Sequence, residues 1–237
     1  MIIPDNNRRR GSRLATAATV LFIAIGCTAI GFGLWGNPPP PRPPASAAEA
    51  SPAQQPVTIT PSPEPISVLP APQVARVVGP ILTASEPTQI NIPAIGVHSV
   101  LMQLGQNPDG TVQTPSLDEA SPAGWYTGSP TPGAIGPSVI LGHVDSRVEG
   151  RTVFYRLGDM RPGDEVLVTR ADATVAVFVV DRVEEYPKDN FPQFTVYGNI
   201  DHAGLRLITC GGQFNKTTRT YPDNVVVYAS LVSSHAA

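Results

Sequence analysis

Cysteine is scarce in this sequence: only Cys27 and Cys210 occur among its 237 residues. Cys27 stands inside a long apolar run, so Cys210 is the only cysteine in the rest of the chain. Exported proteins use cysteines in pairs, as disulfides. A lone thiol in such a protein has no intramolecular partner and is a candidate reactive group. The alternative is that Cys210 is a small buried hydrophobe at the end of a strand.

A basic surface and a helical period are also missing. Residues 80–237 carry 10 Lys and Arg against 16 Asp and Glu, a difference of −6. This balance excludes a nucleic-acid-binding surface. Beyond the apolar run there is no helical period of useful length, and the chain has no internal repeats. Because no helix is expected in this part of the chain, an all-β barrel or sandwich is the architecture that fits.

The apolar run covers residues 14–34, which include no charged side chain. Its length matches the ~20 residues that cross a bilayer as a helix. Four arginines among residues 8–13 precede it, and such basic flanks stay in the cytoplasm. We therefore expect a cytoplasmic basic tail over 1–13 and a transmembrane anchor over 14–35. The protein would be single-pass in the cell membrane, with its C-terminal domain extracellular.

Two other export signals compete with a transmembrane anchor. A signal peptide cleaved near Ala45 to Ala48 would have small residues for a peptidase, but the apolar run exceeds the ~7 to 15 residues of a usual signal core. A lipoprotein site at Cys27 would lie too deep within the run. We therefore interpret Cys27 as a plain intramembrane cysteine.

Proline is unevenly distributed, with 13 of the 27 prolines between residues 37 and 72. A segment of proline, alanine and serine with few aromatics does not bury enough apolar surface to fold. We expect residues 36–80 to form an extended, disordered spacer. Residues 81–233 are then the folded domain.

From about Thr83 the sequence consists of short runs rich in Val, Ile, Thr or Tyr, bounded by Gly, Pro, Asn or Asp, which is typical of strands. Residues 170–174 predict a hairpin connection, and residues 151–160 leave room for one helical turn. We expect seven or eight strands. The runs are TQINIPAIGV, HSVLMQL, PSVILGHV, EVLVTR, TVAVFVVDRVEEY, LRLITC and NVVVYASLV.

Alternation along the strand that ends at Cys210 bears on whether the thiol is accessible. Successive side chains point to opposite faces of a sheet, so Cys210 shares a face with Arg206 and Ile208. A face that carries an arginine is expected to be partly solvated. The glycines at 211 and 212 leave the backbone open to another chain. This pattern favours an accessible thiol.

A thiol needs activation to act as a nucleophile, and cysteine enzymes supply a histidine and an oxyanion stabiliser. Of the four histidines, His143 ends an apolar strand, where its side chain can project over a barrel rim. His202 lies in a loop just before the cysteine strand. The other two, His98 and His235, lie in an early strand and in the C-terminal tail.

Arg219 is the favoured cationic partner of the thiol. It stands nine residues after Cys210, and this spacing allows a turn and an antiparallel return strand. A guanidinium has a fork of donors that suits a carbonyl oxygen gaining negative charge. Lys216 and Arg206 are the competitors.

Several motifs together resemble the sortases, and specifically the class F sortases of high-GC Gram-positive bacteria. They are INIPAIGV, GWYTGSPTPGAIG, GHVDS, LITCGG and KTTRTYPDNVVVYA, in that order, between about Pro80 and Leu231. The resemblance implies an eight-stranded sortase barrel and a cysteine transpeptidase without a cofactor. Such an enzyme cuts an LPXTG-like sorting signal of a surface protein between Thr and Gly.

The resemblance also implies roles for single residues. Cys210 would be the nucleophile, His143 the general acid and base, and Arg219 the residue that steadies the substrate carbonyl and its oxyanion. Thr209, Asp145 and Arg206, which stand within or beside these motifs, are expected to contact the substrate. An amine, such as that of a lipid-linked peptidoglycan precursor, would resolve the thioacyl enzyme. Without an amine acceptor, hydrolysis is expected instead.

One position departs from the family motif T-L-x-T-C, because Arg206 occupies the place of the first threonine. Substrate contacts beside the cysteine are therefore expected to differ. Glu184, Glu185 and Asp189 lie where some sortases bind calcium. Without a recognisable ligand spacing, they are assigned no metal.

Two alternatives come from other functional classes. A cell-wall L,D-transpeptidase would also be exported, β-rich and dependent on Cys and His, but an SHGC-like run is expected in it and RLITC lacks this run. A non-catalytic envelope module would need no thiol. It predicts that Cys210→Ala changes nothing but packing.

Overall fold

The structure is a computed structural model that describes residues 39–47, 78–116, 121–147 and 150–237. The expected basic tail and transmembrane anchor, residues 1–35, lie outside the described residues. Within the described ranges, no helix is long and apolar enough to cross a membrane.

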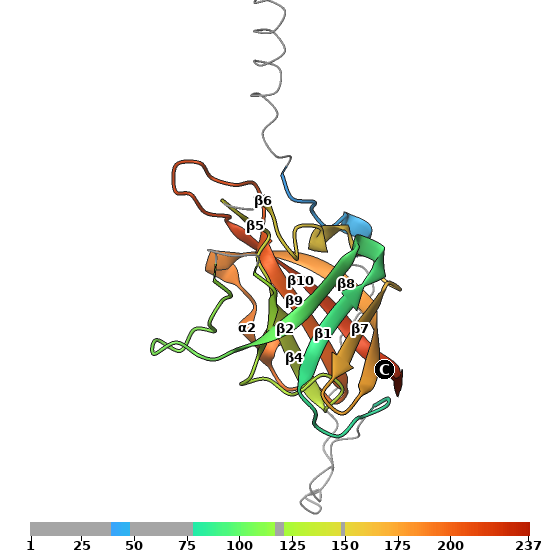
Figure 1. Ribbon diagram of the computed structural model, residues 1–237. Helices are drawn as coiled ribbons and strands as arrows, with labels where there is room; N and C mark the ends of the chain where they lie inside the picture. Colours follow the sequence, from blue (N-terminus) through green and yellow to red (C-terminus); the bar gives the residue numbers. More distant parts are fainter. Residues whose placement is uncertain (1–38, 48–77, 117–120, 148–149) are drawn as a thin grey trace, which may run out of the picture. The chain divides into compact units, whose positions relative to one another are not determined.

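Eight strands form a closed barrel, in the spatial order β1-β2-β3-β4-β9-β10-β8-β7, and β7 pairs with β1 to close it (Figure 1). This confirms the expected all-β class and the strand number. A two-stranded hairpin, β5 with β6, is separate from the barrel sheet. The barrel strands are β1 Pro87–Ile92, β2 Val97–Leu104, β3 Ala123–Tyr126, β4 Gly136–Leu141, β7 Glu165–Arg170, β8 Thr174–Pro187, β9 Ala203–Gly211 and β10 Asp223–Ala236.

The connections contain only short pieces of helix. The hairpin strands are β5 Asp145–Ser146 and β6 Gly150–Arg151, and the α-helix is α2 Gln193–Tyr197. Single 3-10 turns are η1 Ala45–Ala47, η2 Pro93–Ile95, η3 Leu157–Asp159 and η4 Lys188–Asn190. Of these, η3 falls inside the stretch 151–160 that was expected to hold one helical turn.

Turn residues explain most strand ends. The hairpin between β7 and β8 occupies the three positions 171–173, as expected, and Ala173 adopts a φ of 60° there. The run at 88–97, expected as one strand, is divided in two. Pro93 begins the turn η2, and Gly96 ends it in the left-handed conformation with a φ of 69°, which glycine adopts without a steric penalty.

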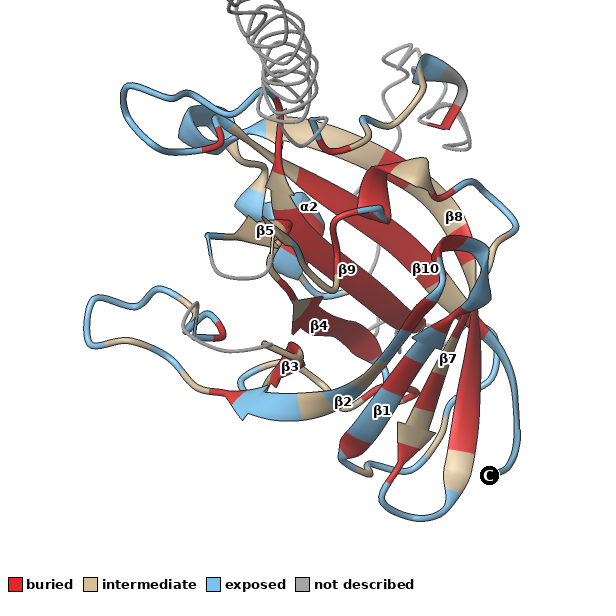
Figure 2. Ribbon diagram, turned by 45° about the horizontal axis from the view of Figure 1, so that its top comes forward, coloured by how far each residue is buried: buried red, intermediate tan, exposed pale blue. Residues whose placement is uncertain are grey.

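The barrel interior is the main core. It is filled by apolar side chains from every barrel strand, and buried stretches dominate β9 and β10 in Figure 2. The largest fully buried members are Phe154, Phe178, Ile90, Ile92, Leu157, Met160, Ile140, Leu205 and Leu207. Phe154, Leu157 and Met160 come from the connection after β6, which therefore packs into the core of the barrel.

A second apolar cluster covers the outer face of β4, β9 and β10. Its buried members are Val139, Val196, Ile208, Val226 and Tyr228, and Val196 comes from α2. The helix was not expected from the sequence, because five residues show no helical period. As a result β9 is buried on both faces, and Cys210 is its one half-buried residue.

Residues 39–47, which the composition placed in the extended spacer, contact the barrel. Arg42 Nε donates to Glu185 Oε2 at 2.7 Å, and Tyr155 OH donates to the carbonyl of Pro39 at 3.1 Å. Ala47 is 1% exposed and belongs to the main core cluster. This part of the spacer is therefore an element of the folded domain.

Candidate active site

Two parallel strands bring His143 and Cys210 to the same end of the barrel. In the register of β4 and β9, Leu141 pairs with Ile208. His143 and Cys210 each follow these residues by two positions, and the amide of Gly142 continues the ladder by donating to Ile208 O at 3.1 Å. Neighbouring strands lie about 4.8 Å apart. The two side chains therefore leave adjacent strands at equivalent positions.

Cys210 is half-buried and packs against a small apolar cluster of Val144, Tyr155 and Tyr221. The backbone beside it is tightly packed. A Cβ atom at Gly211 would lie 2.8 Å from a methyl group of Val225. The backbone next to Cys210 is therefore tightly packed, while the Cys210 side chain is partly exposed to solvent.

Lys188 makes a direct contact with the thiol, since its Nζ donates to Cys210 Sγ at 3.3 Å. The backbone amide of Lys188 donates to the carbonyl of Pro222 at 3.0 Å, which fixes the start of η4 against the start of β10. Asn224 of β10 pairs with Cys210 on one side and with Tyr186 of β8 on the other. The long lysine side chain therefore crosses β10 to reach the cysteine.

His143 is oriented from both its side chain and its backbone. Its Nε2 lies 2.7 Å from the carbonyl oxygen of Pro115, which only accepts, so Nε2 carries a proton in this contact. Its own carbonyl accepts from Thr152 Oγ1 at 2.6 Å and from the amide of Phe154 at 3.1 Å. No hydrogen bond joins His143 to Cys210 in the described part of the chain.

Arg219 stands in the loop between β9 and β10. Asn215 shapes this loop: its carbonyl accepts from the Arg219 amide at 2.7 Å, and its side-chain oxygen accepts from the amides of Thr217 and Thr218. Arg219 itself has a φ of 58°, a left-handed conformation that is uncommon for a residue with a Cβ atom. No hydrogen bond or ion pair joins its side chain to another described residue.

Asp145 connects the two segments that flank the cysteine. The hydroxyl of Tyr221 donates to Asp145 Oδ2 at 2.5 Å. Burial and, second, this hydrogen bond raise the pKa of the Tyr221 hydroxyl, so the phenol stays a neutral donor at neutral pH. Because Asp145 begins the β5–β6 hairpin and Tyr221 ends the β9–β10 loop, the bond ties these segments together.

A pocket of about 830 Å³ brings these groups together at one end of the barrel. Four cationic side chains and His143 line it, against the single carboxylate of Asp145, so the pocket favours negative charge. The predicted catalytic residues His143, Cys210 and Arg219 all line it. The other lining residues are Val144, Asp145, Ser146, Arg147, Lys188, Phe214, Lys216, Thr220 and Tyr221.

Two of the predicted substrate contacts do not line this pocket. Thr209 is 5% exposed, and alternation places it with the core residues Leu205 and Leu207 inside the barrel. Arg206 is also 5% exposed, donates through Nη1 to the carbonyl of Leu205 and lies over the ring of Tyr228 at 4.6 Å. The expectation that the face of β9 carrying Arg206 is solvated is wrong. The second apolar cluster, which includes Val196 of α2 and is called the α2 cluster below, covers that face.

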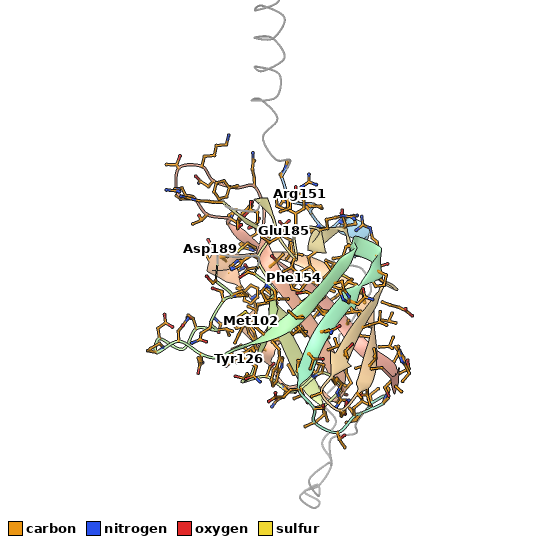
Figure 3. All side chains as sticks on the ribbon, viewed as in Figure 1. Met102, Tyr126, Arg151, Phe154, Glu185 and Asp189 are labelled. Carbon is orange, nitrogen blue, oxygen red and sulfur yellow. The ribbon has the colours of Figure 1, made fainter. Side chains whose placement is uncertain are left out.

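The acidic residues near the end of β8 have other partners. Glu184 accepts from Arg182 Nε at 2.6 Å, and Glu185 accepts from Arg42. Figure 3 shows Glu185 and Asp189 at the end of the barrel that carries the β5–β6 hairpin. Among the described residues, no group of three or more His, Cys, Asp or Glu could hold a metal ion.

A second pocket of about 570 Å³ lies between the first half of β2 and residues 151–156. Arg151, Arg156 and His98 line it, and no cysteine does. The candidate chemistry is therefore at the pocket that holds Cys210.

Sequence reasoning missed Lys188 and Tyr221. Lys188 lies in the sequence between two strands, without a motif, and only the pairing of β8 and β9 with β10 brings it to the thiol. Tyr221 stood within a quoted motif, but its partner Asp145 is 76 residues away. No signal in a single sequence indicates either contact.

A closed barrel with a cysteine and a histidine at the ends of adjacent parallel strands is an arrangement suited to acyl transfer through a thioester. The family model described as Sortase domain matches residues 90–232. The chain therefore belongs to the sortase family of cysteine transpeptidases. The match includes His143, Cys210 and Arg219. A sequence comparison with curated proteins gives no match.

Solved structures of sortases are among those to which this chain is similar. The Streptococcus pneumoniae sortase C is 21% identical, with 64% of this chain and 68% of that chain covered and a TM-score of 0.48. The lid mutant of Corynebacterium diphtheriae sortase A is 22% identical, with 63% and 73% covered and a TM-score of 0.46. The Clostridium perfringens Sortase D5 transpeptidase is 21% identical, with 62% and 79% covered and a TM-score of 0.45. The family assignment rests on the match to the sortase model.

Proposed function

We propose that this chain is a membrane-anchored sortase of class F. It cleaves an LPXTG-like sorting signal between Thr and Gly and joins the protein to a cell-wall amine. The parallel register of β4 and β9 carries the proposal, because it places His143 and Cys210 at equivalent positions over one pocket. The motifs quoted from the sequence support the class.

The reaction follows from the roles of three residues. Cys210 Sγ attacks the carbonyl carbon of the threonine, and the guanidinium of Arg219 donates to the oxygen as it gains negative charge. The bond from carbon to nitrogen then breaks, and the glycine amine leaves with a proton from His143. An incoming amine attacks the thioester, gives its proton to His143 and releases the Cys210 thiolate. Water in place of the amine gives a free carboxylate.

The membrane part of the proposal rests on residues 1–35, outside the described residues. The uncharged run 14–34 and the arginines before it support a cytoplasmic N-terminus and an extracellular barrel. A lipid-linked peptidoglycan precursor would then be an available amine acceptor. Of the three substrate contacts that were expected, Asp145 is the one that lines the pocket.

Mass spectrometry of the purified protein with LPXTG-like peptides tests the proposal. A thioester adduct on Cys210 and release of the peptide beginning at glycine are expected from the natural sequence. Adding a small amine should convert the acyl product into an amide. Cys210→Ala should abolish the adduct and the cleavage, because no other described side chain in the pocket is a thiol. Normal cleavage by Cys210→Ala would exclude the sortase mechanism.

Topology has a separate test. Reporter fusions at Met1 and after Ala237 should report opposite compartments if residues 14–35 form the anchor. A mature chain that begins near Ala48 would instead show secretion and cleavage.

A further inference from the structure

The β9–β10 loop, which carries Arg219, has little attachment to the rest of the described structure. Residues 213–220 are all exposed, and the hydrogen bonds of Asn215 stay within the loop. Among the described residues, only one hydrogen bond joins residues 213–221 to a residue outside them. It runs from the Tyr221 hydroxyl to Asp145 Oδ2, at 2.5 Å. Tyr221 is also the one buried residue of this stretch, so the position of the loop depends on it.

Asp145, the acceptor of this bond, belongs to a segment that the barrel core holds in place. The carbonyl of His143, two residues earlier, accepts from Thr152 Oγ1 at 2.6 Å and from the Phe154 amide at 3.1 Å. Phe154 is fully buried in the main core. Asp145 itself pairs with Arg151 in the β5–β6 hairpin. The bond therefore joins an exposed loop to a segment with fixed contacts to the barrel.

Each end of the bond stands two positions after a residue of the proposed mechanism. Asp145 follows His143, and Tyr221 follows Arg219. From this placement we propose that Tyr221 and Asp145 are positioning residues, whose hydrogen bond sets the place of the Arg219 guanidinium over the pocket. The inference deepens the proposed function and rests on it, because Arg219 is taken there as the donor to the oxyanion.

The chemistry of the bond suits this task. A phenol that donates to a carboxylate makes a charge-assisted hydrogen bond, which is about twice as strong as a neutral one. The ring of Tyr221 adds packing, because it contacts Val144 and Tyr155. Its centroid also lies 5.0 Å from that of Phe214, near the start of the loop. Tyr221 thus holds both ends of the loop.

Placement matters because an oxyanion donor acts only close to the oxygen that gains charge. A displacement of about 1 Å can cost about 10²-fold in rate. The Arg219 side chain has no hydrogen bond to a described residue, so its place in the free enzyme follows from its backbone. The left-handed turn at Arg219 fixes that backbone within the loop, and the Tyr221 bond fixes the loop on the barrel.

Tyr221→Phe removes the hydroxyl and keeps the ring, and its kinetics with an LPXTG-like peptide test the proposal. We expect kcat to fall about tenfold while KM stays within about twofold, because the oxyanion contact is made only in the transition state. In an Arg219→Asn background the same change should cost less than about twofold, since no guanidinium remains to be positioned. An equal loss in both backgrounds would overturn the proposal.

Asp145 variants test the other end of the bond. Asp145→Ala removes the acceptor and should reproduce the loss of Tyr221→Phe, and the double variant should be no slower than either single variant. Asp145→Asn keeps a side-chain oxygen that accepts from the phenol, so it should lose less than Asp145→Ala. A further loss from Asp145→Ala in the Tyr221→Phe background, with a raised KM, would show a direct substrate contact and overturn the positioning role of Asp145.

Tyr186→Phe is the matched control. Its hydroxyl also donates to a carboxylate, that of Glu184, but neither residue lines the pocket that holds Cys210. Its kcat/KM should stay within about twofold of the natural value. A loss equal to that of Tyr221→Phe would show that the effect is not specific to the Arg219 loop, and it would overturn the proposal.

Limited trypsin digestion of the full chain tests the attachment of the loop without a sorting substrate. The loop offers Lys216 and Arg219 as cleavage sites, and proteases cut segments that open locally. Mass spectrometry should show cleavage after Lys216 to be several-fold faster in Tyr221→Phe and unchanged in Tyr186→Phe. Equal rates would overturn the proposal even where the peptide is cleaved. If the natural sequence cleaves no peptide but trypsin still separates the two variants, the loop attachment is supported and the proposed sortase function is wrong.

Discussion

Arg219 combines a strained backbone with a side chain that has no partner in the described structure. A left-handed φ at a residue with a Cβ atom costs about 1–2 kcal/mol, and the bonds from Asn215 hold the residue in that conformation. Strain of this kind persists where the surrounding structure imposes it, and it is common at functional sites. The strained turn at Arg219 lies in the loop that borders the Cys210 pocket, and Arg219 lines that pocket.

Asparagine tolerates the left-handed conformation, so Arg219→Asn separates backbone strain from side-chain chemistry. Stability should stay unchanged or rise by a few tenths of a kcal/mol, up to about 1 kcal/mol, while peptide cleavage falls about 10²-fold or more, because an oxyanion donor is lost. Thermal unfolding and kcat/KM with an LPXTG-like peptide measure the two effects. Arg219→Lys is the control for charge and should not restore cleavage. Near-normal kcat/KM in Arg219→Asn would remove the role assigned to the guanidinium.

Arg206 shows how a correct alternation pattern led to a wrong inference about solvent. It shares a face with Cys210 and Ile208, as predicted, but that face is covered by the α2 cluster. Burial lowers the pKa of Arg206 to about 10, and its Nε has no hydrogen-bond partner among the described residues. The sequence indicates which face a side chain takes. It does not indicate whether a distant segment covers that face.

Replacing Arg206 with methionine should therefore stabilise the protein. The change removes a buried charge that forms no ion pair with a described carboxylate, at the loss of its stacking on Tyr228. Neutral replacement of buried charged groups is often stabilising, here by about 1–3 kcal/mol. Chemical denaturation measures this, and kcat/KM should stay within about threefold. A destabilised Arg206→Met, or one with lost cleavage, would show that the guanidinium has a structural or substrate-binding role after all.

At the scale of single elements, the sequence predicted strands well where they are long and β-branched. The runs at 165–170 and 174–186 match β7 and β8 almost residue for residue. β3, of only four residues, was missed, because AGWY shows neither alternation nor β-branched enrichment. It forms because β2 pairs with it in parallel and β4 in the antiparallel direction. Its pairing is thus decided by tertiary structure.

Segment 39–47 depends on close packing at one glycine. A Cβ atom at Gly158 would lie 2.1 Å from the carbonyl oxygen of Pro41, a rigid backbone atom. Gly158→Ala should displace the segment, because overpacking of this kind typically costs about 1–3 kcal/mol. We expect faster elastase cleavage after Ala45 or Ala47, while the barrel remains folded.

Gly105→Ala is the matched control for this experiment. Its added Cβ atom would meet only the end of the Gln113 side chain, at 3.1 Å, which can move. Cleavage in segment 39–47 should then remain slow. Equal protection of the segment in Gly158→Ala would mean that the contact with Pro41 is not what holds it.

At the scale of the whole molecule, the fold class, the strand number and the family could be predicted from one chain. The candidate site could be predicted in part, because the predicted strands end at His143 and Cys210. Contacts that depend on neighbouring strands could not. Lys188 reaches the thiol only because β10 lies between β8 and β9, and residues 39–47 have a disorder-like composition yet bury Ala47 in the core.

The last prediction concerns what residues 39–47 contribute to the whole domain. All eight barrel strands lie between 87 and 236, so a chain that begins at Val78 should fold into the same barrel as one that begins at Pro39. It loses the burial of Ala47 and leaves Glu185, whose side chain is 14% exposed, without its arginine partner. A loss of about 1–2 kcal/mol is expected from one small buried side chain and one ion pair. This corresponds to a Tm lower by about 2–8 °C for a domain of this size.

Activity should respond differently from stability. No residue of 39–47 lines the pocket that holds Cys210, so kcat/KM of the shorter chain for an LPXTG-like peptide should stay within about threefold. Arg42→Gln in the chain that begins at Pro39 isolates the ion pair and should lower stability by less than about 1 kcal/mol, because Arg42 is mostly exposed. A shorter chain that does not fold would show that the barrel requires the segment. A loss of more than about tenfold in kcat/KM would show that the active site requires it. Retained activity with a lower Tm would confine its role to support of the domain.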